Sequence, residues 1–132
     1  MSQENVELAH QVINAIEQRD LPGLIELTDP AVEWHSAFVV GTGSFYRGHV
    51  GMREYVRDMN DAWEIVRLDV DHEFALGDIV LFVGRIHYRG KGSGVEAESV
   101  SGYVLTFREG KLVRFRPFRE PEKALEAVGL SK

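Results

Sequence analysis

The chain has 132 residues and no cysteine, and 15 Lys and Arg side chains against 21 Asp and Glu give it a net charge of -6. We expect one domain over residues 1–132, without disulfides, thiolate catalysis or cysteine-ligated metals, and without nucleic acid or an anionic membrane as a partner. Because the sequence shows no basic and apolar leader and no apolar run long enough to span a bilayer, it predicts a cytoplasmic protein.

The first half of the chain is dominated by helical periodicity. Apolar residues recur at every third or fourth position near the N-terminus, and Asp20 with Pro22 forms the start signal of a second helix. Asp29 and Pro30 end that second helix. In chain order we predict helices over residues 2–19 and 20–27, a strand over 31–38, a glycine-rich loop over 39–48 and a helix over 49–63.

The second half alternates between polar and apolar residues. From Val66 to Leu76 every even position is apolar or carries a ring, and the odd positions as far as Glu73 are charged, which is typical of a half-buried strand. The glycine-rich segment over residues 90–94 is predicted to be a hairpin loop rather than a phosphate cradle, because no helix begins after it. The remaining predicted elements are strands over residues 79–89, 95–108 and 111–119 and a closing helix over 120–128.

Helices that precede an antiparallel meander predict the α+β class. We expect a curved antiparallel sheet wrapped around the N-terminal helices. The helices would cover the concave face of such a sheet only in part, so the pattern predicts a conical cavity.

Several segments carry a family resemblance, among them NAIEQRDL over residues 14–21, DPAVEW over 29–34, YRGH over 46–49, GSGVE over 92–96 and EPEKALEAVGL over 120–130. They resemble the SnoaL-like branch of the nuclear transport factor 2-like superfamily, which includes ketosteroid isomerase, polyketide cyclases and limonene epoxide hydrolase. The resemblance covers nearly the whole chain and implies a conical barrel of the cystatin-like fold that often forms homodimers through its sheet face. The resemblance does not indicate a particular activity, because one fold hosts many functions.

Isomerase chemistry of that family needs a carboxylate base and two proton donors around a developing oxyanion. The resemblance places the base at Ser36 and the two donors near Val12 and Tyr103, so only Tyr103 has a suitable group. Epoxide hydrolase chemistry would find Arg85 but no inward pair of aspartates. Steroid-type isomerisation is therefore disfavoured.

Two side chains are predicted to carry any catalysis. His72 lies on the apolar face of the strand over residues 66–76, where it would face the cavity, so it is a candidate acid or base. A hydrogen-bonded core histidine is the alternative. Tyr103 shares a strand face with two serines that leave room for a ligand, and its phenol is a candidate donor to an oxyanion.

Six further residues are predicted to contact a ligand because of their strand parity, aromatic character or charge: Trp34, Ser36, Trp63, Phe74, Arg85 and Phe107. Arg85 has the alternative of an ion pair with Glu98 on the neighbouring strand. A slip of one residue in the first strand would exchange Ser36 for His35 in the pocket. The His, Asp and Glu side chains are too scattered to predict a metal site, and no cofactor motif is found.

The sequence thus predicts a protein that binds a small apolar, cyclic or aromatic metabolite in a conical pocket, with no cofactor. Whether it is an enzyme stays open; cofactor-free acid–base catalysis of the isomerase, cyclase or hydrolase type is the expected form. The alternative is a non-catalytic homodimeric module whose pocket is filled by its own aromatic side chains.

Overall fold

The computed structural model describes residues 2–36 and 45–130, which form four helices and six strands among the described residues. In chain order these are α1 (Ser2–Gln18), α2 (Leu21–Leu27), β1 (Thr28–Trp34), β2 (Tyr46–Arg47), α3 (Gly48–Ala62), β3 (Trp63–Leu76), β4 (Ile79–Gly90), β5 (Glu96–Arg108), β6 (Lys111–Phe118) and α4 (Pro121–Ala127). The predicted α+β class is confirmed.

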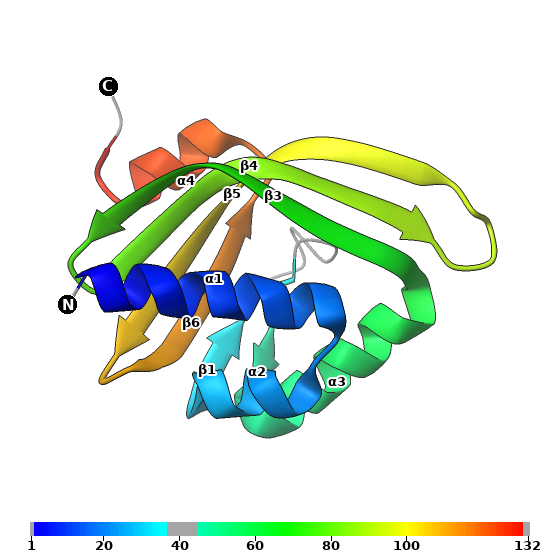
Figure 1. Cartoon of the computed structure of the whole chain (residues 1–132), viewed down its shortest axis with the longest axis horizontal. Helices are drawn as coiled ribbons and strands as arrows, with labels where there is room; N and C mark the ends of the chain where they lie inside the picture. The colour runs from blue at the N-terminus through cyan, green and yellow to red at the C-terminus, as the bar shows by residue number, and fades with distance from the viewer. Residues whose placement is uncertain (1, 37–44, 131–132) are drawn as a thin grey trace.

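The strands form one curved sheet in the order β2-β1-β6-β5-β4-β3 (Figure 1). Strands β3 to β6 are an antiparallel meander, as predicted, but β1 runs parallel to β6, so the sheet is mixed. Within the described residues the sheet stays open, with β2 and β3 at its two edges. A parallel pair needs a long crossover connection, and the segment from β2 to β5 supplies it between β1 and β6.

The element boundaries differ from the prediction mainly around β1. This strand begins at Thr28, three residues early, and β2 lies inside the segment predicted to be a loop. β3 begins at Trp63 rather than Val66. The predicted end of the first strand at residues 37–38 and the predicted loop over 39–44 lie outside the described residues.

The two faces of the sheet are covered by different helices (Figure 1). α1, α2 and α3 pack on the concave face and form the main core, whose largest fully buried side chains include Trp34, Phe82 and Phe107. α4 covers one end of the opposite face, where Ala124 packs against Leu81 and Val104. We call the rest of that opposite face the outer face. It carries charged side chains of β3, β4 and β5, among them Asp69, Arg85 and Glu98.

A bulge in β3 reverses the direction of its side chains. The register with β4 shifts between Val70 and His72, which leaves Asp71 without a cross-strand partner. Gly84 permits the close approach, because a Cβ built there would overlap the carbonyl oxygen of Asp69. One extra residue moves every later side chain to the other face. Beyond the bulge, Phe74 accordingly lies opposite a residue of the α4 side of the sheet.

α1 also protects the free edge of β3. The Leu68 backbone N–H donates to Oε2 of Glu17 at 2.8 Å, so a side chain of α1 satisfies one donor that the sheet leaves unpaired. Unpaired edge donors are templates for association with other chains. Glu17 therefore attaches α1 to the sheet and, at the same point, makes the edge of β3 less available for pairing with another chain.

Candidate functional site

A hollow between α3, the end of β1, β2 and the start of β3 brings together two of the predicted site residues, Ser36 and Trp63. This α3 cavity has a volume of about 290 Å³ and is lined by Ser36, Tyr46, Tyr55, Asp58, Met59, Ala62 and Trp63. Its walls are mostly aromatic rings and aliphatic carbon. Among the described residues, no Lys, Arg or His lines it.

An aromatic cluster connects the α3 cavity to the interior of the cone. The ring of Tyr55, which lines the cavity, lies 5.0 Å from the ring of Trp34, and Trp34 stacks on Phe115 at 4.2 Å. Phe115 in turn stacks on Tyr103 at 5.8 Å. These rings come from α3, β1, β6 and β5, and packed aromatic rings hold one another in defined orientations. We call the three rings behind Tyr55, which are not among the residues that line the cavity, the aromatic floor: Trp34, Phe115 and Tyr103.

Two buried donors in this floor have no hydrogen-bond partner among the described residues. They are Nε1 of Trp34, whose side chain is fully buried, and the hydroxyl of Tyr103, whose side chain is 3% exposed. Tyr55 lies next to Trp34 and Ser101 lies near Tyr103, but neither forms a hydrogen bond of normal geometry with its neighbour. A buried donor without a partner costs about 1–3 kcal/mol. Such donors are uncommon in native proteins, and an ordered water, an ion or a ligand supplies the missing acceptor.

Burial keeps the phenols in this region protonated. It raises the pKa of Tyr103 to about 12, because the charged phenolate would lose its hydration inside the core. It likewise raises the pKa of Tyr55, which is buried between Trp34 and Tyr46. At neutral pH these side chains therefore act as hydrogen-bond donors and not as bases.

A hydrogen bond between Tyr46 and Asp58 frames the open side of the cavity. The Tyr46 hydroxyl donates to Oδ2 of Asp58 at 2.6 Å, which joins β2 to α3. Burial, followed by this contact with Asp58, raises the pKa of Tyr46 to about 12. Arg57 lies 3.6 Å from the other carboxylate oxygen, on the exposed side of α3. Asp58 is the one carboxylate among the described residues that line the cavity.

The structure resolves the predicted choice between Ser36 and His35. Ser36 is buried and lines the α3 cavity, whereas His35 points away and its Nε2 lies 2.7 Å from Oε2 of Glu33. Arg114 donates to the same oxygen at 3.2 Å. The pKa of Glu33 lies below its usual value, and the hydrogen bond with His35 is the largest cause. Arg114 lowers this pKa further through its charge and its hydrogen bond, whereas burial opposes the shift.

The aromatic residues predicted to contact a ligand lie in different places. Trp63 lines the α3 cavity, and Trp34 lies in the aromatic floor behind Tyr55. Phe107 is a fully buried core residue. Phe74 lies after the bulge and is 37% exposed, so the prediction that it faces the cone is wrong.

The predicted orientation of His72 is also wrong. His72 is exposed and lies opposite Val83, which packs on the α4 side of the sheet. The strand alternation that placed it inside the cone holds only as far as Val70, because the bulge adds one residue. His72 is therefore outside the α3 cavity, and the site loses the predicted imidazole.

Arg85 forms ion pairs on the sheet, which was the alternative to contact with a ligand. Its Nε and Nη2 each donate to the carboxylate of Asp71 at 3.2 Å, and Nη1 lies 3.5 Å from Glu98. These contacts and the neighbouring charge of Asp69 raise the pKa of Arg85, with the hydrogen bond to Asp71 as the largest cause. Arg85 lies on the outer face, away from the residues that line the α3 cavity.

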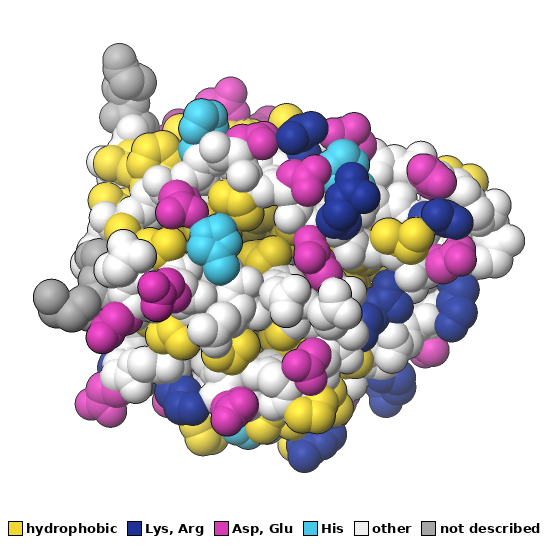
Figure 2. Space-filling model, in the orientation of Figure 1, with side chains coloured by type: hydrophobic (Ala, Val, Ile, Leu, Met, Phe, Trp, Pro, Cys, Tyr) yellow, Lys and Arg dark blue, Asp and Glu magenta, His cyan; other side chains and the backbone are white. Residues whose placement is uncertain are grey.

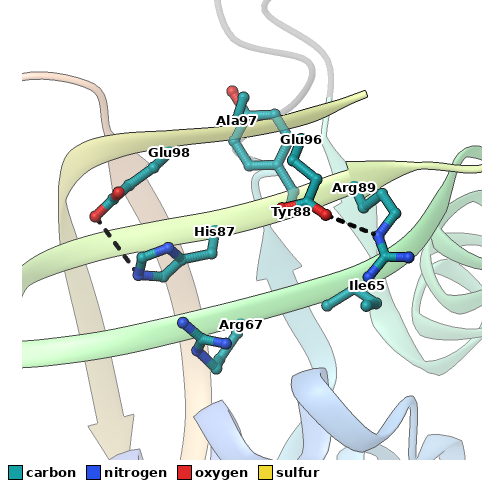
Figure 3. A pocket seen from close by; sticks show the side chains of 8 residues that line it. All are labelled: Ile65, Arg67, His87, Tyr88, Arg89, Glu96, Ala97 and Glu98. Atoms are coloured by element: carbon teal, nitrogen blue, oxygen red, sulfur yellow. Dashed lines mark ion pairs between the residues drawn. The ribbon is translucent and has the colours of Figure 1, made fainter. Parts of the chain in front are cut away.

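A second hollow, the outer-face groove, lies on the extended end of β3, β4 and β5 (Figure 3). It measures about 380 Å³ and is lined by Ile65, Arg67, His87, Tyr88, Arg89, Glu96, Ala97 and Glu98. Glu98 lies 3.6 Å from Nε2 of His87, and Glu96 lies 3.5 Å from Nε of Arg89. Figure 3 shows both pairs facing each other across the groove. Figure 2 shows acidic and basic side chains interspersed over this end of the molecule. Paired charges of this kind do not select a ligand of one sign.

The structure offers no metal site in residues 2–36 and 45–130, where no group of three or more His, Cys, Asp or Glu side chains is arranged around a common point. In the same residues no helix is long and apolar enough to cross a bilayer.

Five residues that line the α3 cavity were absent from the predicted site: Tyr46, Tyr55, Asp58, Met59 and Ala62. Tyr55 had a usable signal, because it lies on the apolar stripe predicted for the third helix. Asp58 lies three residues further along the same helix and so is close to Tyr55 on its surface. Tyr46 had no local signal, since it was placed in a loop and its position depends on pairing with β1.

The comparisons with known proteins agree with this architecture. The SnoaL-like domain family matches residues 9–115 of the chain. No curated protein compared with the chain matches it.

Solved structures share the fold at low sequence identity. An NTF2-like protein of unknown function from Burkholderia pseudomallei is 22% identical, with 96% of this chain and 98% of that chain covered and a TM-score of 0.77. TerC, co-crystallised with polyporic acid, is 23% identical, with coverage of 95% and 97% and a TM-score of 0.76. A protein with a ketosteroid isomerase-like fold from Catenulispora acidiphila, in complex with trimethylamine, is 14% identical, with coverage of 94% and 93% and a TM-score of 0.75.

Proposed function

The chain belongs to the SnoaL-like domain family, and from this premise we propose that it binds a small cyclic or aromatic metabolite in the α3 cavity. The observation that carries the proposal is the pair of buried, unpartnered donors, Nε1 of Trp34 and the hydroxyl of Tyr103, in the aromatic floor behind Tyr55, whose side chain lines that cavity. A ligand whose carbonyl or hydroxyl oxygen reaches past the ring of Tyr55 would supply the acceptor that these donors lack. That two proteins of the same fold were solved with small organic molecules is consistent with this role.

The catalytic form of the proposal rests on Tyr103. A neutral phenol in a dry interior stabilises negative charge that develops on a substrate oxygen, because the donor is already oriented and shielded from water. Tyr103 is therefore our candidate for an oxyanion donor in a cofactor-free isomerase, cyclase or hydrolase. His72 has no part in this form, since it lies outside the cavity.

The test is a thermal-shift screen of the whole chain against cyclic ketones, epoxides, polyketide-like aromatics and small acids, with product formation followed by mass spectrometry. A ligand at one hundred times its Kd stabilises a protein by about 2.7 kcal/mol, which is about 10 °C for a domain of this size. The effect of a true ligand should weaken in Tyr103→Phe and persist in His72→Ala, the matched control outside the cavity. If no class of compound stabilises the protein, the proposed ligand site is wrong.

A separate observation favours self-association through the outer face. Val100 is 57% exposed and Ile65 is 40% exposed there, between rows of charged side chains of both signs. An isologous interface brings the same patch of two subunits together, so charges of both signs on one patch can meet their opposites around the exposed apolar residues. We propose a homodimer through this face; sedimentation of the protein and of Val100→Asp tests it, and a monomer at all concentrations contradicts it.

A further inference from the structure

The α3 cavity combines aromatic walls with a single negative charge. Tyr46, Tyr55 and Trp63 contribute their rings from three different elements, β2, α3 and β3. The rings of Tyr46 and Tyr55 lie 5.5 Å apart at 71°, so they form a corner rather than a flat wall. Trp63 is held edge-on by Tyr88, with the ring centres 4.9 Å apart at 80°. The cavity therefore has a preformed set of aromatic surfaces.

The charge at the cavity comes from Asp58. The hydrogen bond from Tyr46 fixes the carboxylate at the edge of the cavity. Arg57 is the cation nearest to it in the described structure, but the 3.6 Å separation exceeds a hydrogen bond and its side chain is 66% exposed. An exposed pair of this kind is strongly screened by water and contributes little. The Asp58 side chain is itself 49% exposed, so its charge acts at the edge of the cavity, where an occupant would displace part of the water that screens it.

These features select for one kind of chemical group. Aromatic faces attract cations, and the attraction is strongest where water is displaced. A primary ammonium needs several hydrogen-bond acceptors, whereas an alkylated ammonium needs few and gains from contact with apolar walls. A volume of about 290 Å³ is at the lower limit of ligand pockets, of about 300–1,000 Å³, and suits a compact group.

We infer that the α3 cavity receives an alkylated ammonium group, which lies against the rings of Tyr46, Tyr55 and Trp63 and pairs with Asp58. This inference rests on the proposed function and narrows it: the metabolite carries a cationic substituent, in addition to an oxygen that meets the buried donors.

The test compares choline with 3,3-dimethyl-1-butanol, which has the same shape and no charge. Binding is followed at constant ionic strength by calorimetry and by the NMR shift of the ligand methyl protons, which move upfield when they lie over ring faces. Choline should bind about tenfold more tightly than its neutral isostere.

Two matched variants separate the local charge from the general acidity of the helix. Asp58→Asn keeps the shape and the acceptor for Tyr46 but removes the charge, and it should weaken choline binding about tenfold. Asp61→Asn removes an exposed charge from the same helix, outside the residues that line the cavity, and should change binding by less than about twofold. Neither variant should affect the neutral isostere, and denaturation curves establish that both variants are folded.

Three outcomes would overturn the inference: equal binding of choline and its isostere, equal weakening by the two variants, or no binding of choline at millimolar concentration. If any of these is found while a cyclic or aromatic compound still stabilises the protein through Tyr103, the cation inference alone fails. If no compound of any class binds, the proposed function fails with it.

Discussion

Replacing Tyr103 by Phe should stabilise the ligand-free protein. The Tyr103 side chain is 3% exposed and its hydroxyl has no partner among the described residues, so folding removes that group from water without compensation. A buried, unpaired polar group costs about 1–3 kcal/mol, and phenylalanine preserves the ring and its stacking on Phe115. We expect a gain of about 1 kcal/mol in the free energy of unfolding, or about 4 °C in Tm for a domain of this size.

Urea denaturation of the purified, ligand-free protein measures this change, with Tyr46→Phe as the matched control. Tyr46 donates a 2.6 Å hydrogen bond to Asp58 at a partly exposed site, so its loss should cost about 1 kcal/mol. The same chemical change is thus expected to have opposite signs at the two positions. If Tyr103→Phe instead lowers the free energy of unfolding by about 1 kcal/mol or more, as expected for Tyr46→Phe, the Tyr103 hydroxyl has a partner in the folded chain. It would then not be a free donor for a ligand.

Three further substitutions test the framework of the site. Gly84→Ala should lower the free energy of unfolding by about 3 kcal/mol, because the new Cβ would overlap the Asp69 carbonyl oxygen at the bulge. Gly110→Ala, in an open turn with φ of 78°, should lower it by about 1 kcal/mol. Similar losses for the two variants in thermal melts would contradict this reasoning. Glu17→Ala should speed hydrogen exchange of the amide that it caps on β3 at least tenfold, and unchanged exchange would show that the edge is protected by other means. The pKa of Glu33 is lowered in the folded state, so its contribution to stability is present above the unfolded pKa of about 4.5 and is lost as the pH falls through the lower folded pKa. Glu33→Gln should therefore flatten the acid limb of the curve of stability against pH. An unchanged acid limb would show that this carboxyl contributes nothing.

The sequence by itself determined the order of the elements and the class of the fold. Helical periodicity before residue 63 and alternation after it are local signals, and they are strong enough to define α1, α3 and the four strands of the meander. Alternation also placed Tyr103 and Phe107 on the inner face of β5 and Ser36 inside the cavity. These positions were predictable because side-chain direction in a regular strand depends only on parity.

The tertiary structure decided where the alternation breaks and which distant residues meet. The extra residue after Val70 turned His72 and Phe74 to the α4 side, and nothing in the local pattern of β3 marks that position. The Tyr46–Asp58 contact exists because β2 pairs with β1 and lies beside α3. A bulge and a short edge strand are stabilised by contacts with residues far away in the chain, here the close approach at Gly84 and the pairing with β1, so a periodicity that reports only local conformation could not reveal them.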